Sequence, residues 1–97
     1  VRNSGGDMVA VSDDEILEAM RLLARTSGVF GEPAGVTGFA GLLKYAQTGK
    51  LDSHERVAVI VTGNGLKDSE SAKKAAGNPF LVEPTLEAVN RVLGSMI

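Results

Sequence analysis

The chain has 97 residues, which is enough for one small domain with one core but not for two. Ten basic and twelve acidic side chains leave a net charge of −2, and the scattered basic residues exclude a continuous groove for nucleic acid. The absence of cysteine excludes disulfide scaffolds and thiolate metal sites. No apolar run approaches the ~20 residues of a membrane helix, so we expect no membrane partner and a cytoplasmic location.

The first predicted elements are a strand and a helix. Residues 7–11 are short, apolar and β-branched, and they follow Gly5-Gly6, which is typical of a buried strand. Ser12 then opens a helix, because Glu15 stands three residues later, as in a capping box. Apolar residues recur at helical spacing beyond it, and Gly28 is predicted to end this helix.

A glycine-rich helix is predicted next. After a very short apolar element at residues 29–31, Pro33 suits the first turn of a helix that extends through residues 35–46. Glycines recur there every third residue, at Gly35, Gly38 and Gly41. Each interior glycine destabilises a helix by ~1 kcal/mol relative to alanine, so something must approach this face closely. A neighbouring helix or strand and a bound ligand both remain possible.

The strongest predicted strand covers residues 56–62, whose core is apolar at every position. Such a strand is expected to be covered on both faces, as in a parallel sheet. A short helix over residues 69–76 that ends at Gly77, a strand over 80–82 and a last helix that starts at Pro84 complete the pattern. The order β-α-β-α-β-α-β-α predicts an α/β fold, with a mostly parallel sheet and flanking helices, over residues 1–97 as a single domain or segment.

The sequence Gly63-Asn64-Gly65 follows the strongest predicted strand and precedes a helix. A dinucleotide fingerprint would need a third glycine where Asp68 stands, so that interpretation fails. The glycines indicate either a tight turn or the edge of a site at the carboxyl end of the strand. In the second case, the hydroxyl of Thr62 would point into that site.

Two further polar residues have alternative interpretations. Glu32 precedes Pro33 at the start of the glycine-rich helix, where a carboxylate can interact with the helix dipole or line a pocket as an acid. The residues alone do not separate these two roles. His54 is the only histidine and lies in a polar turn, so we expect an exposed surface residue and no metal site.

Taken together, these segments resemble the C-terminal part of threonine synthases, pyridoxal-phosphate enzymes of the tryptophan-synthase-β fold type. The resemblance runs through essentially the whole chain. Its most specific part is Thr62-Gly63-Asn64-Gly65-Leu66-Lys67-Asp68, while Glu32-Pro33-Ala34-Gly35 is shared with dehydratase and racemase relatives.

The resemblance implies roles for five cofactor-binding residues. Thr62 would hydrogen-bond the pyridine nitrogen of pyridoxal 5'-phosphate, and its neutral hydroxyl would moderate the electron sink that an acidic partner would sharpen. Glu32 would line the cofactor ring. Gly63, Asn64 and Gly65 would complete this wall, and the two glycines would let the backbone approach the ring.

The resemblance also implies what this segment lacks. The lysine that forms the Schiff base in such enzymes lies in an N-terminal motif that is absent from the sequence, so we expect no catalytic residue here and no activity of the isolated chain. The implied partners are the missing N-terminal part of the same enzyme, a small-molecule substrate and a second copy in a homo-oligomer.

The implied parent is a lyase that converts O-phospho-L-homoserine and water to L-threonine and phosphate. Two alternatives remain open. The chain could be a small non-catalytic binding or regulatory domain derived from such an enzyme. It could also be a segment of a related threonine/serine dehydratase or of another phospho-amino-acid synthase.

Overall fold

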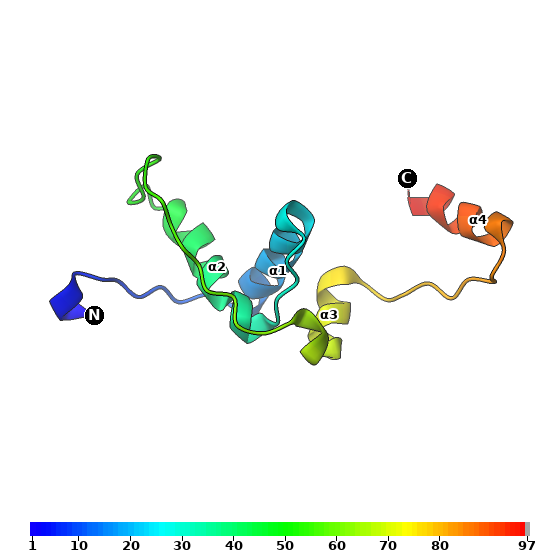
Figure 1. Cartoon of the computed structure of the whole chain (residues 1–97), viewed down its shortest axis with the longest axis horizontal. Helices are drawn as coiled ribbons and strands as arrows, with labels where there is room; N and C mark the ends of the chain where they lie inside the picture. Colours follow the sequence, from blue (N-terminus) through cyan, green and yellow to red (C-terminus); the bar gives the residue numbers. More distant parts are fainter. Residues whose placement is uncertain (97) are drawn as a thin grey trace.

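The computed structural model describes residues 1–96, and within them the secondary structure is entirely helical (Figure 1). Four α-helices and two 3₁₀ turns follow one another along the chain: η1 (Arg2–Ser4), α1 (Asp13–Ser27), α2 (Pro33–Ala46), η2 (Gly65–Lys67), α3 (Ser69–Ala76) and α4 (Leu86–Met96). Helices α1 and α2 lie side by side, α3 packs against α1, and α4 stands apart at the C-terminal end. All four predicted helices are therefore confirmed.

Helix α1 begins and ends as the local sequence predicts. The Ser12 hydroxyl accepts a hydrogen bond from the Glu15 N–H at 3.1 Å, and the Glu15 carboxylate accepts one from the Ser12 N–H at 3.0 Å. At the other end, Gly28 adopts a left-handed conformation with φ of 76° and donates its N–H to the Ala24 carbonyl. Both ends satisfy backbone groups that a helix leaves without partners.

A small core holds α1, α2 and α3 together. Met20 of α1 and Val36 of α2 are fully buried, and α3 contributes Ala75. The Arg21 guanidinium donates a hydrogen bond of 3.2 Å to the Ala75 carbonyl, which fixes the end of α3 on α1. This arrangement sets the position of the turn between α2 and α3, where the predicted site residues lie.

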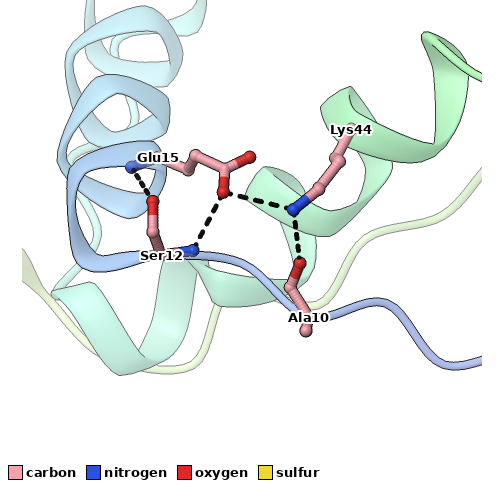
Figure 2. A network of polar contacts seen from close by, with 4 residues as sticks. All are labelled: Ala10, Ser12, Glu15 and Lys44. Carbon is pink, nitrogen blue, oxygen red and sulfur yellow. Dashed lines mark hydrogen bonds and ion pairs between the residues drawn. The ribbon is translucent and has the colours of Figure 1, made fainter.

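A polar network joins α2 to the segment before α1 (Figure 2). The Lys44 ammonium donates a hydrogen bond of 2.9 Å to the Ala10 carbonyl and lies 3.3 Å from the Glu15 carboxylate. The hydrogen bond from the Ser12 backbone N–H, followed by that from Lys44, lowers the pKa of Glu15 below its ordinary value of 4.5. One carboxylate therefore serves both the helix cap and the contact between the two helices.

The predicted parallel sheet is wrong: the structure contains no β-strand within residues 1–96. The apolar segments at 7–11, 57–61 and 80–82 have no helical or strand assignment, and two of their side chains, Ile60 and Leu81, are 81% and 104% exposed. Among these residues, the sole β-type pairing is one isolated antiparallel bridge between Gly31 and Asn64. A strand exists only when its backbone pairs with a neighbour, and an apolar run specifies burial rather than a partner.

The glycine face of α2 has chain segments as its neighbours. A Cβ at Gly35 would stand 2.8 Å from the Gly63 amide nitrogen, one at Gly38 would lie 3.9 Å from Val59, and one at Gly41 would lie 4.0 Å from Val9. Two segments that were predicted as strands therefore run close to this helix face. Close packing of the chain on itself accounts for Gly35 without a ligand.

Candidate functional site

The candidate site forms where residues 62–65 run beside residues 30–32. The Glu32 N–H donates a hydrogen bond of 2.8 Å to the Gly63 carbonyl, and the Gly65 N–H donates one of 2.9 Å to the Phe30 carbonyl. These two bonds flank the bridge between Gly31 and Asn64. They bring the predicted site residues, which are far apart in the sequence, to the N-terminal end of α2.

Thr62 is exposed at the edge of this pairing. A Cβ at Gly35 would stand 3.2 Å from its backbone nitrogen and 3.2 Å from its hydroxyl oxygen, so the hydroxyl lies beside the first turn of α2. A hydroxyl group both donates and accepts hydrogen bonds. Thr62 thus offers an accessible neutral polar group. The next residue, Gly63, is anchored by its backbone hydrogen bond to Glu32.

Glu32, the acidic residue predicted for this site, reaches Gly63, which follows Thr62 in the chain. It occupies the N-cap position of α2, but its side chain makes no capping hydrogen bond. The carboxylate instead fills the space in which a Cβ at Gly63 would stand. The side chain is 21% exposed, and its Oε1 lies 3.9 Å from the Lys67 ammonium. The Glu32 side chain therefore does not cap α2 in this structure, and its role in lining the cofactor stays a prediction.

Asn64 and Gly65 have structural contacts of their own. The Asn64 side chain accepts a hydrogen bond of 2.9 Å from the Leu66 N–H and caps η2. Gly65 is buried, and a Cβ there would lie 2.5 Å from the Phe30 ring. Both residues thus shape the turn, and the cofactor roles that the resemblance implies for them stay predictions.

Sequence reasoning did not select Phe30 or Lys67. Phe30 packs on the turn from a segment that precedes α2, and Lys67 reaches Glu32 from η2. Neither residue carries a spacing signal for such a role, because each contact joins residues about 35 positions apart and depends on the tertiary structure. His54 lies in an exposed turn, as predicted, and its N–H donates to the Asp52 side chain at 2.9 Å.

A wide cleft lies elsewhere on the molecule. It has a volume of about 720 Å³ and lies between residues 5–9, the face of α2 that carries Gly38 and Gly41, and residues 57–60. Neither Thr62 nor Glu32 lines it. In the part of the chain that the structure describes, no helix is both long and apolar enough to cross a lipid bilayer.

Comparison with known proteins identifies the family. A model of the pyridoxal-phosphate dependent enzyme family matches residues 1–63. The chain is 43% identical over 93 residues to a threonine synthase of Methanocaldococcus jannaschii, a match that covers 96% of this chain and 23% of that relative. It is also 49% identical over 69 residues to one of Bacillus sp. (71% of this chain, 20% of the relative) and 43% identical over 95 residues to one of Synechocystis sp. (96% and 24%).

The chain therefore belongs to the pyridoxal-phosphate dependent enzyme family, and the resemblance to threonine synthases is confirmed. It spans about a quarter or less of the length of the curated relatives it matches.

The residues at the candidate site fit one edge of pyridoxal phosphate. The Thr62 hydroxyl is neutral and accessible, which suits a ring nitrogen, and the Glu32 carboxylate lies over Gly63, which has no side chain.

Proposed function

We propose that this member of the family forms the C-terminal segment of a threonine synthase, which converts O-phospho-L-homoserine and water to L-threonine and phosphate. The observation that carries the proposal is the backbone pairing of residues 63–65 with residues 30–32, which sets the Glu32 carboxylate against Gly63, the residue that follows Thr62 in the chain. The high identity to threonine synthases over nearly the whole chain supports the choice of reaction.

In this proposal, Thr62 hydrogen-bonds the pyridine nitrogen and Glu32 lines the ring. Bound pyridoxal phosphate supplies an electron sink for negative charge that develops on the substrate. A neutral hydroxyl does not stabilise a protonated ring nitrogen as a carboxylate would, so the nitrogen beside Thr62 would stay largely unprotonated. The hydroxyl therefore orients the ring while keeping the electron sink moderate. The two backbone hydrogen bonds at Gly63 and Gly65, which we call the clamp, anchor the segment that carries this hydroxyl.

The remaining parts of the active site belong to the rest of the enzyme in this proposal. The segment carries five lysines, and none has the sequence context of the Schiff-base lysine that the resemblance implies. The coverage of a quarter or less of each relative supports a longer parent chain. The proposed partners are the N-terminal part of the enzyme, a small-molecule substrate and a second copy of the enzyme.

The test replaces Thr62 in the full-length enzyme that carries this segment. Thr62→Val removes the hydrogen bond with little change in volume, and leaving a buried acceptor without a partner costs ~1–3 kcal/mol. We expect kcat to fall roughly 10- to 100-fold, with a smaller change in KM. Thr62→Ser keeps the hydroxyl and should retain most activity. Equal losses in the two variants would mean that Thr62 acts through packing, and the cofactor role would be refuted.

A further inference from the structure

An ion pair joins the turn after Gly65 to the start of α2. The Lys67 Nζ lies 3.9 Å from the Glu32 Oε1, and the two side chains differ in exposure, at 69% for Lys67 and 21% for Glu32. The carboxylate is thus the less exposed member of the pair and lies over Gly63, while the ammonium is mostly exposed to solvent.

The Glu32 carboxylate makes no capping hydrogen bond to its own helix. Its position at the N-cap of α2 would allow it to accept a hydrogen bond from the first turn, but it makes none. A glutamate side chain has several rotatable bonds, and ordering it reduces its entropy. Contact with Gly63 and attraction to Lys67 are the interactions that favour the observed position.

The backbone of Lys67 is held by hydrogen bonds that continue from the clamp between residues 30–32 and residues 63–65. Its N–H donates a hydrogen bond of 3.1 Å to the Asn64 carbonyl, and the Asn64 side chain caps the turn through the Leu66 N–H. The Gly65 N–H then attaches this turn to the Phe30 carbonyl, two residues before Glu32. These hydrogen bonds therefore hold the backbone of Lys67 near that of Glu32, within reach of the ion pair.

We infer that Lys67 is a positioning residue, whose ammonium holds the Glu32 carboxylate over Gly63, the residue that follows Thr62 in the chain. It acts through Glu32 and does not itself contact the cofactor. This inference deepens the proposed function and rests on it, because Glu32 must line the cofactor for its position to matter. It also gives the exposed Lys67 a role at a site for which the sequence patterns indicate Thr62 and Glu32.

The test measures the affinity of the full-length apoenzyme for pyridoxal phosphate by absorbance titration, together with kcat and KM. Exposed ion pairs contribute little, so we expect Lys67→Met to weaken cofactor binding by about two- to five-fold. Lys67→Arg keeps the charge and should restore binding. Lys73→Met is the matched control, because Lys73 also pairs with a glutamate, at 3.8 Å from Glu70, but both residues belong to α3 and neither contacts Glu32 through an ion pair. We expect no change in affinity for that variant.

A double-mutant cycle with Glu32→Gln separates a positioning role from a general effect of charge. If Lys67 acts through Glu32, Lys67→Met should have no further effect in the Glu32→Gln background. The same loss in both backgrounds, or no loss in either, would overturn the inference.

Thr62→Val distinguishes this outcome from failure of the proposed function. If that variant loses activity as expected while Lys67→Met binds normally, only the role of Lys67 is refuted. If Thr62→Val is fully active, the proposed cofactor role of the site is refuted, and the role of Lys67 is refuted with it. Melting temperatures of all variants exclude misfolding as the cause of any loss.

Discussion

Gly35→Ala is the sharpest structural test of how the site is held. A Cβ at this position would stand 2.8 Å from the Gly63 nitrogen and 3.2 Å from both the nitrogen and the hydroxyl oxygen of Thr62. Backbone atoms cannot rotate away, so residues 62–63 must shift away from α2. Overpacking of this kind destabilises by ~1–3 kcal/mol. Alanine gains up to about 1 kcal/mol over glycine in a helix, which offsets only part of that loss.

Gly38→Ala provides the matched control on the same helix. Its Cβ would lie 3.9 Å from Val59, which is ordinary contact, so it should gain up to about 1 kcal/mol without a clash. Urea denaturation followed by circular dichroism should therefore give Gly35→Ala a free energy of unfolding about 1–3 kcal/mol below that of Gly38→Ala. Equal stability of the two variants would show that residues 62–63 are not seated against α2, and the described site geometry would be refuted.

The remaining predictions concern acidification and the isolated chain. Hydrogen bonds from Ser12 and Lys44 lower the pKa of Glu15 from 4.5, so its stabilising effect is present above pH 4.5 and is lost as the pH falls below that value. The melting temperature should thus decrease on acidification, and less steeply in Lys44→Met; equal slopes would contradict the network of Figure 2. The isolated 97-residue chain should form no threonine, and its exposed apolar residues, such as Ile60 and Leu81, should bind an apolar dye and favour self-association in sedimentation experiments. Turnover, or a monomer without dye binding, would contradict these expectations.

The sequence predicted the helices well because their signals are local. Ser12 and Glu15 form the capping box within four residues, and Gly28 and Gly77 stand where α1 and α3 end. The strands failed for the opposite reason, since the apolar residues 57–61 carry no information about which backbone lies beside them. They run near the glycine face of α2 instead of pairing in a sheet.

In the candidate site, too, local motifs could be predicted from the sequence and contacts between distant segments could not. Thr62 and Glu32 could be selected from their motifs, and the structure brings them together, but their cofactor roles stay predictions. The contacts of Phe30 with Gly65 and of Lys67 with Glu32 could not be predicted, because they depend on a pairing between segments about 30 residues apart.

The clamp between residues 30–32 and 63–65 also has a consequence for the order of folding. The clamp closes a loop of about 30 residues with two backbone hydrogen bonds, so its formation loses chain entropy before it gains many contacts. Helix α1, in contrast, needs only neighbouring residues for its caps. We therefore expect α1 to form early and the pairing of residues 30–32 with residues 63–65 to form late. Substitutions in the clamp should then accelerate unfolding more than they slow folding.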